Sequence, residues 1–441
     1  MRFNHFLSIL FAVSLASCLG TETTEYELSN DANVVSFSFL KNDSVPHLET
    51  AVFVIDNDNN HIYNPDSLPY QTRIDSVSPA ISFRSTSGSM IINSKGDTIF
   101  LTGSDTIDFS AQPLTLINHP ASQVKDSIRT YKISVNVHQL EPELYVWNKI
   151  NDKVYSHTAS QQKLMWFNEK LHLFVNSGIN NHLYTSVNGV TWTQETLSGL
   201  QPNSNFRTMT IHDNTLYFSN GGAIYQSSNA TDWAKLTNSN TAYSLATLLF
   251  SLNNELFAIV SNSAGEYYFA HSQNATDWTI GEQIPENFPI EGFANVTYTT
   301  KTNKEKALLL GGHSTDNEIL NTKWSTEDGS YWVNFTIAEP EFGSMADASI
   351  IRYDEKLLLF GGVDKNNAVL GHTLLESDNE GLNWNVPDST CNQFPETYEL
   401  RTSQSVAVDN DHNIYIVGGK NRTTYFKDVW KGKINRLGFV E

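Results

Sequence analysis

The sequence predicts an all-β protein, in which an N-terminal Ig-like β-sandwich is followed by a six-bladed β-propeller. Three observations lead to this fold class. Short β-rich runs alternate with polar turns up to about residue 142, six aliphatic strands recur from residue 170 onward, and a turn that ends in Trp follows five of those strands. No long helical pattern interrupts the N-terminal part.

The chain begins with the pattern of an export signal. Arg2 precedes an apolar run from Phe6 to Ala16, which is too short for a membrane-spanning helix because such a helix needs about 20 apolar residues. The next letters, "LASC", resemble the lipobox of bacterial lipoproteins, which implies that residues 1–17 are a lipoprotein signal peptide and that Cys18 is the lipidation site. Acyl chains on Cys18 would hold the mature chain on a membrane, whereas the alternative is an ordinary secreted protein with a chance Cys.

Residues 18–25 are expected to form an acidic linker after the lipidated Cys. No Asp directly follows Cys18, and within the lipoprotein resemblance this favours passage to the outer membrane. The acidic run favours display on the cell surface, with a periplasm-facing position as the alternative.

The charge and the Cys and His content argue against a nucleic-acid partner, an intramolecular disulfide and a metal site. The chain has 28 Lys plus Arg against 48 Asp plus Glu, and loss of residues 1–17 removes only Arg2, so that 27 minus 48 leaves a net charge of −21. Such a charge argues against a nucleic-acid partner. Cys391 is the second of only two Cys, so acylation of Cys18 leaves no intramolecular disulfide. The His residues show no metal-ligand spacing, and we expect neither a metal nor a cofactor.

The sandwich is predicted to span residues 26–142, with antiparallel strands. Its last run places Tyr131, Ile133, Val135 and Val137 on one face before Pro142 marks the boundary. Six triplets of Asp, a hydroxyl residue and an apolar residue occur here, beginning at Asp43, Asp66, Asp75, Asp97, Asp105 and Asp126. They either start strands through Asx-type hydrogen bonds or, by resemblance, are O-glycosylation acceptors of gut-type Bacteroidetes.

The propeller is predicted to span residues 143–441. Its aliphatic strands contain Leu171, Leu216, Leu256, Leu308, Leu357 and Ile414, which follow one another at intervals of 45, 40, 52, 49 and 57 residues. Each interval is close to the length of one four-stranded blade. Six such strands therefore predict six blades.

A turn that ends in Trp is predicted to close each of five repeats. The indoles are Trp192, Trp233, Trp278, Trp332 and Trp384. In four of the turns an Asn or Asp stands four residues before the Trp, where its side chain can bond the turn backbone, and Gly189 and Gly329 are expected at positive φ. We expect each indole to enter the seam between neighbouring blades, because large aromatic surfaces are stabilised by burial.

The sixth repeat lacks a closing turn. It contains Trp430, but no further Trp follows before Glu441. Ahead of the first blade, residues 144–150 contain Trp147 and have no other assignment. We expect this segment to pair with the C-terminal strand and close the ring, which would remove two exposed edges.

The motifs together resemble a known family. "LASC", the sandwich with "YNPDSLPY" (Tyr63 to Tyr70) and the ending "VWKGKINRLGF" are similar to Bacteroidetes lipoproteins of unknown function, which have an N-terminal β-sandwich and a C-terminal Kelch-like or sialidase-like propeller with Asp-box-like turns. The resemblance covers nearly the whole chain. It implies a fold and a membrane location but transfers no catalytic residue.

Sialidase-type catalysis is the hypothesis that this resemblance raises. It requires three Arg around a carboxylate, a Tyr nucleophile activated by Glu and an Asp acid, but the Arg residues of the propeller do not occupy equivalent inner-strand positions, and the "RIP" signature is absent. We therefore predict no catalytic residue. Other paired-carboxylate glycosidases stay open, because acidic residues are plentiful.

A ligand site is expected at the channel mouth, where the loops after the second strands meet those that enter the next blades. The candidate ligand-binding residues on these loops are Arg207, His313, Asp347, Asp364, Arg401 and Arg422. The alternative is that they form a solvated loop face. We predict a membrane-anchored, non-catalytic binding or scaffold lipoprotein that recognises a glycan or a protein; the second hypothesis is a carbohydrate-active hydrolase that uses the same face.

Overall fold

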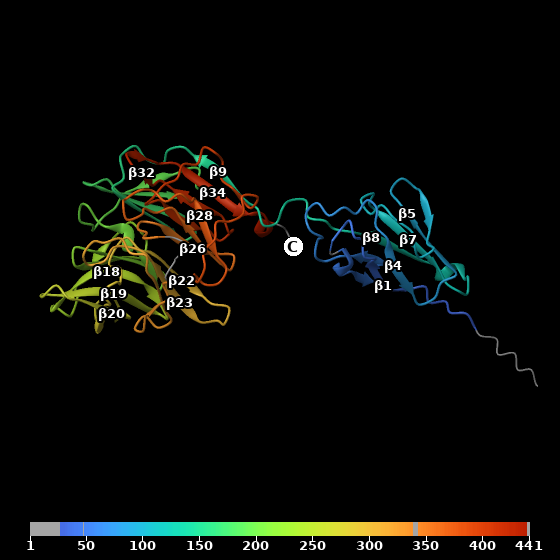
Figure 1. Cartoon of the computed structure of the whole chain (residues 1–441), viewed down its shortest axis with the longest axis horizontal. Helices are drawn as coiled ribbons and strands as arrows, with labels where there is room; N and C mark the ends of the chain where they lie inside the picture. Colours follow the sequence, from blue (N-terminus) through green and yellow to red (C-terminus); the bar gives the residue numbers. More distant parts are fainter. Residues whose placement is uncertain (1–26, 47, 338–342, 439–441) are drawn as a thin grey trace, which may run out of the picture. The chain divides into compact units, whose positions relative to one another are not determined.

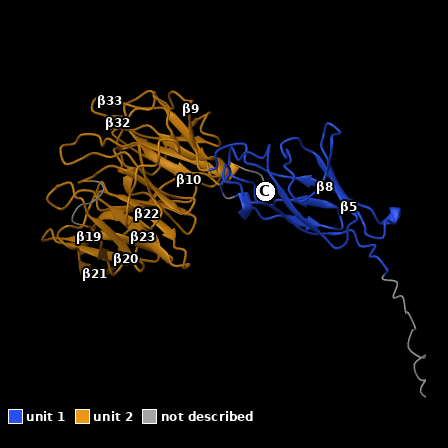
Figure 2. Ribbon diagram, turned by 45° about the vertical axis from the view of Figure 1, so that its right-hand side comes forward, with its two compact units in different colours: residues 1–142 blue, residues 143–441 orange. Residues whose placement is uncertain are grey.

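The computed structural model describes residues 27–46, 48–337 and 343–438. The predicted signal peptide, Cys18 and the acidic linker 18–25 lie outside the described residues. The chain divides into two compact units, residues 1–142 and residues 143–441 (Figure 2). Both units are built from strands, and the helical elements in the described ranges are short 3-10 turns: η1 (Leu48–Thr50), η2 (Lys125–Ser127), η3 (Phe206–Thr208) and η4 (Asn435–Gly438).

Unit 1 consists of two sheets (Figure 1). One pairs β1 with β4, and the other has the strand order β2-β3-β8-β7-β5-β6. The strands are β1 (Val34–Phe39), β2 (Val54–Asp56), β3 (His61–Tyr63), β4 (Pro79–Phe83), β5 (Gly88–Ile92), β6 (Thr98–Phe100), β7 (Leu114–His119) and β8 (Arg129–Ser134). Apolar side chains of both sheets form one core.

The last strand of unit 1 has the predicted buried face. Tyr131, Ile133 and Val135 are buried, and Val137 packs against the same core. One pairing differs from the prediction of antiparallel strands, because β3 and β8 are parallel. A long segment separates these two strands in the sequence, and only such a connection can return the chain for parallel pairing. Local sequence patterns do not indicate which distant strands will pair.

Unit 2 contains several sheets of antiparallel strands arranged around a centre (Figure 1). Four sheets have four strands each: β10 (Gln161–Phe167), β11 (Lys170–Asn176), β12 (Asn181–Ser186) and β13 (Thr193–Glu195); β14 (Thr210–His212), β15 (Thr215–Asn220), β16 (Ala223–Ser227) and β17 (Ala234–Lys235); β18 (Tyr243–Leu252), β19 (Glu255–Asn262), β20 (Tyr267–Ser272) and β21 (Thr279–Gln283); β22 (Ala294–Thr299), β23 (Glu305–Leu310), β24 (Lys323–Thr326) and β25 (Val333–Asn334).

The remaining strands of unit 2 follow the same plan, except that β29 pairs parallel with β9. A three-stranded sheet contains β26 (Ser349–Tyr353), β27 (Lys356–Phe360) and β28 (Leu374–Ser377). The last large sheet has the order β29-β9-β34-β31-β30, with β9 (Tyr145–Asn151), β29 (Asn392–Gln393), β30 (Ser405–Val408), β31 (Ile414–Val417) and β34 (Val429–Ile434). A short ribbon joins β32 (Lys420–Asn421) to β33 (Thr424–Tyr425).

The first strands of these sheets contact one another in a closed cycle. β14 contacts β18, β18 contacts β22, β22 contacts β26, β26 contacts β30, and β30 returns to β10. β10 in turn contacts η3, which leads into β14. Unit 2 is therefore a β-propeller, with the first strand of each sheet at the centre.

The segment that precedes the first of these sheets lies beside the C-terminal strand. β9 pairs antiparallel with β34, with Trp147 opposite Gly432. A Cβ atom at residue 432 would lie 2.1 Å from the ring of Trp147, so only Gly leaves room for this indole. Trp147 then stacks on Phe394 at a ring distance of 4.3 Å. Residues from both ends of unit 2 thus complete one sheet.

The prediction that the indoles lie between neighbouring sheets is confirmed. Each of the five packs in an apolar cluster shared by two sheets, and the pairs of strands that flank them are β31 and β11 for Trp192, β11 and β15 for Trp233, β15 and β19 for Trp278, β19 and β23 for Trp332, and β23 and β27 for Trp384. Trp147 occupies the corresponding cluster between β27 and β31. Trp233, Trp278 and Trp384 are buried, whereas Trp192 and Trp332 are half-buried.

Each turn also holds its own indole. The Nε1 atoms of the five Trp donate hydrogen bonds of 2.8 to 3.1 Å to the carbonyl oxygen three residues earlier. Gly189 and Gly329 have positive φ, as predicted. At residue 329 a Cβ atom would also lie 2.1 Å from the ring of Phe257 in the preceding sheet. The turn backbone and the neighbouring sheet are therefore in direct contact.

Candidate functional site

A polar cavity lies at the centre of the propeller. Its volume is about 260 Å³, and its walls come from β10, the η3 region, the end of β15, β18, β22, β26 and β30. This volume lies near the lower end of the range of about 300 to 1,000 Å³ for small-molecule sites. The cavity could therefore hold one or two sugar units or a short peptide segment.

Polar side chains on the cavity wall are fixed by the neighbouring sheets. Thr247 Oγ1 donates to the carbonyl of Ile290 at 2.6 Å, and Asn295 Nδ2 donates to the carbonyl of Leu249 at 2.6 Å. Ser349 Oγ donates to the backbone carbonyl of Gln404 at 2.7 Å. These bonds use the hydroxyl protons of Thr247 and Ser349 and one of the two amide protons of Asn295, while the three side-chain oxygen atoms keep the capacity to accept a hydrogen bond.

Two Gln side chains tie sheets together at the cavity. Gln162 Nε2 donates to the carbonyl of Val417, and Gln404 Nε2 donates to the carbonyl of Phe360, both at 2.6 Å. The Gly that follows each carbonyl allows this approach, because a Cβ atom there would lie within 2.7 Å of the Gln side chain. The glycine pairs of the sequence thus have a packing role at the inner ends of the second strands.

The structure brings Arg207 and Asp347 together on the cavity wall. Arg207 Nη1 forms an ion pair with Asp347 Oδ1, and Nη2 lies 3.4 Å from Oδ2. Ser403 Oγ donates to Asp347 Oδ2 at 3.3 Å. Asn205 Oδ1 accepts a hydrogen bond from the backbone N–H of Arg207 and so positions the short helix η3. Two of the six candidate residues therefore share one contact in the cavity.

Lys163 is the second cation that lines this cavity. It lies in β10, is half-buried, and has no ion pair or side-chain hydrogen bond among the described residues. Burial lowers the pKa of its ammonium group from 10.5 to about 8, because the charged form is poorly hydrated there. Sequence reasoning missed this residue. The segment QQKLMWF, residues 161–167, has no alternation of polar and apolar residues, so the sequence contains no signal for this position.

His313 lies at the border of the cavity. A Cβ atom at Gly292, a cavity residue, would lie 2.7 Å from His313 Cδ2 and 3.4 Å from Asp347 Oδ1. Asp364 and Arg422 are not cavity residues. The Asp364 carboxylate accepts hydrogen bonds from the backbone of residues 366 and 368, which lower its pKa, and Arg422 occupies the exposed turn between β32 and β33.

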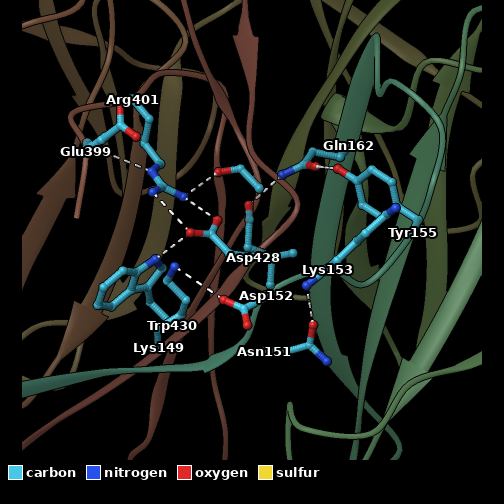
Figure 3. A network of polar contacts seen from close by, with 12 residues as sticks. Lys149, Asn151, Asp152, Lys153, Tyr155, Gln162, Glu399, Arg401, Asp428 and Trp430 are labelled. Carbon is cyan, nitrogen blue, oxygen red and sulfur yellow. Dashed lines mark hydrogen bonds and ion pairs between the residues drawn. The ribbon is translucent and has the colours of Figure 1, made fainter. Parts of the chain in front are cut away.

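Arg401 is buried inside the last sheet and does not reach the cavity wall (Figure 3). Its Nη1 atom lies 2.7 Å from Asp428 Oδ1, and Trp430 Nε1 donates to the other oxygen of the same carboxylate at 2.8 Å. Its other partners are the carbonyls of Glu399 and Gly418 and the ring faces of Tyr398 and Phe426. This guanidinium is fully engaged within the fold, so we leave it out of the candidate site.

The Arg residues of the propeller do not meet at one point. Among the described residues, Arg207 is the one Arg that lines the cavity; Arg352 lies over the ring of Tyr298, and Arg436 is paired with Asp354 and Glu143. Among the described residues, the carboxylates on the wall are those of Glu291 and Asp347. Glu291 is exposed and was missed in the sequence because it lies in a polar loop.

The described residues show neither a metal-binding cluster nor a membrane-spanning helix. No group of three or more His, Cys, Asp or Glu side chains in this part of the chain is placed to hold a metal ion. Within the same residues, no helix has the length and apolar character that a membrane span requires.

Comparison with known proteins identifies both units. A family model described as "DUF6242 beta propeller domain" matches residues 141–441, and the model of the DUF6242 N-terminal domain, a domain of unknown function, matches residues 21–135. None of the curated proteins that were compared matches the chain. A solved structure titled "Structure of YjhT" aligns at 13% identity with a TM-score of 0.46, covering 64% of this chain and 96% of that chain.

Proposed function

The chain belongs to the DUF6242 family, and we propose that it is a non-catalytic binding protein whose propeller cavity holds a polar ligand, either a glycan or a segment of another protein. The observation that supports this most strongly is the cavity itself. Its wall presents oriented oxygen atoms together with the ammonium of Lys163, which has no ion-pair partner among the described residues, and the oxygen-bearing side chains are held in place by the neighbouring sheets.

We also propose the finer architecture that the sequence predicts. Six blades are supported by the cycle of first-strand contacts and by six apolar clusters between neighbouring sheets. Five of these clusters contain the Trp of a closing turn, and the sixth contains Trp147. In this proposal β9 completes the last blade. The two-sheet arrangement of unit 1 supports an Ig-like sandwich that serves as a stalk.

The proposed location is the outer surface of the outer membrane, with a lipid anchor at Cys18. The "LASC" sequence and the acidic residues after it support this location. Labelling of cells with radioactive palmitate should mark the wild-type protein and not Cys18→Ala. Protease added to intact cells should digest the protein; protection until the outer membrane is permeabilised would instead indicate the periplasm-facing position.

A hydrolase that acts in the same cavity is the second candidate. Glu291 and Asp347 both line the cavity, and paired carboxylates are the groups that most glycosidases use. Asp347 is, however, already paired with Arg207 and Ser403. A sialidase-type reaction is disfavoured because one Arg, not three, lines the cavity in the part of the chain that the structure describes.

A glycan array and a protein pull-down, each with two matched variants, test the proposal. Ala246 is exposed and lines the cavity, so Ala246→Trp should fill it and abolish binding. Ala264 is exposed in the turn between β19 and β20 outside the cavity, so Ala264→Trp should bind as the wild type does. Binding that Ala246→Trp leaves intact would contradict a cavity site. Release of sugar products that Glu291→Gln abolishes would favour the hydrolase.

A further inference from the structure

Of the two cations on the cavity wall, one forms an ion pair among the described residues and the other does not. Arg207 and Asp347 neutralise each other through their ion pair. Lys163 has no such partner among the described residues, and burial is the only cause that lowers the pKa of its ammonium group. The positive charge that is available to a ligand is therefore that of Lys163.

The two cations of the wall, Lys163 and Arg207, stand on elements that contact each other. The strand of Lys163, β10, contacts η3, which carries Arg207. An anion that approaches this side of the cavity meets one free charge from Lys163 and one neutralised pair. A singly charged group suits this arrangement better than a dianion, because Glu291 lines the same cavity and would repel additional negative charge.

The hydrogen-bonding capacity of the wall gives a second requirement. Thr247, Asn295 and Ser349 each donate to a backbone carbonyl, so that their oxygen atoms are left to accept. Acceptors on the wall need donors on the ligand. Hydroxyl groups, which are the principal donors of sugars, meet this need.

We propose that the ligand is an acidic carbohydrate, whose carboxylate binds the ammonium of Lys163 and whose hydroxyl groups donate to the wall at Asn295 and Ser349. This inference rests on the proposed binding function and narrows it to one class of ligand. Lys163 is then the residue that determines specificity, since an ammonium group without its own carboxylate favours ligands that supply one.

Paired sugars that differ only at one carbon test the proposal. Oligomers of galacturonate, glucuronate and mannuronate are compared with those of galactose, glucose and mannose, in which a CH₂OH group replaces the carboxylate. In titration calorimetry at pH 7, at least one acidic oligomer should bind ten-fold or more tightly than its neutral partner. Lys163→Met should remove this preference, whereas Lys235→Met, on the exposed outer strand β17, should keep it.

Proton linkage provides a readout that a merely structural role would not change. A bound carboxylate favours the charged form of Lys163, so binding between pH 8 and pH 9 should take up protons, and Lys163→Met should abolish the uptake. Inorganic phosphate should not compete at equal concentration.

Each other outcome overturns the inference. Equal affinity for acidic and neutral oligomers, or an acid preference that survives in Lys163→Met, would contradict it. If neutral sugars bind and Ala246→Trp abolishes that binding, the proposed binding function stands and only the acidic class is wrong. If no oligosaccharide binds, the acidic class is wrong and the binding proposal depends on the pull-down of a protein ligand alone.

Discussion

Replacement of Lys163 by Met should make the propeller more stable at neutral pH. The Lys163 side chain is half-buried on the cavity wall and its ammonium group has no partner among the described residues. Met has a similar length and no charge, so the variant removes the cost of desolvation and keeps most of the packing. A stabilising change at a cavity residue would be unusual, since most substitutions destabilise a protein.

The magnitude and its pH dependence follow from the pKa of Lys163, which burial lowers from 10.5 to about 8. At about 1.4 kcal/mol per pKa unit this gives about 3 kcal/mol, and solvent screening of the partly exposed side chain reduces it to about 1 to 2 kcal/mol. Below pH 8 the folded and unfolded chains both hold the proton, so the full cost is present at pH 7. Between pH 8 and 10.5 only the unfolded chain holds it, and the cost disappears as the pH rises.

Urea denaturation at pH 7 and pH 10 measures this difference, followed by Trp fluorescence because the indoles of unit 2 report on its seams. Lys163→Met should exceed the wild type in free energy of unfolding at pH 7, and the gap should be much smaller at pH 10. Lys235→Met should change little at either pH. The reasoning fails if Lys163→Met is less stable than the wild type at pH 7, or if the gap is the same at both pH values.

Three further substitutions examine the seams and the buried network, each by thermal or urea denaturation. Gly329→Ala should cost about 2 to 4 kcal/mol, since it adds a clash with the preceding sheet to the strain of positive φ, while Gly178→Ala, which has positive φ and open space, should cost only about 1 kcal/mol; equal costs would contradict the clash. Trp278→Ala should cost about 3 to 5 kcal/mol, and a loss below about 1 kcal/mol would show that this seam does not depend on its indole. Arg401→Met should cost about 3 to 5 kcal/mol by leaving the Asp428 carboxylate buried and unpaired, with ligand binding by the folded protein unchanged; lost binding would return Arg401 to the site.

The sequence indicates the seams because their chemistry is periodic. A Trp that follows each aliphatic strand at a similar spacing can be recognised without any knowledge of tertiary contacts, and the partners of Trp233 and Trp278 are the strands on either side of their turns. Positive φ at Gly189 and Gly329 is similarly local. By contrast, the parallel pairing of β3 with β8 depends on residues far apart in the sequence, and nothing in either strand specifies it.

The candidate site was harder to predict, because it depends on the direction in which side chains point. Arg207 and Asp347 are far apart in the sequence and meet only through the cycle of inner strands. Arg401 stands in a loop beside a glycine pair, as a cavity residue would, but its side chain enters the sheet. Lys163 lies in a first strand that lacks the aliphatic signature of the second strands, so the repeat pattern did not point to it.

The two cations Lys163 and Arg401 show how differently this fold treats a buried charge. The guanidinium of Arg401 is 1% exposed in its side chain and has a carboxylate, two carbonyls and two ring faces around it, so every feature of its surroundings offsets its desolvation. Lys163 has none of these among the described residues, and neither of the carboxylates that line its cavity, Asp347 and Glu291, forms an ion pair with it. A chain that compensates one buried cation so completely has the means to compensate the other. Since it does not do so, we infer that the missing negative charge comes from a molecule outside the chain, and that the cost at Lys163 is offset when that molecule binds.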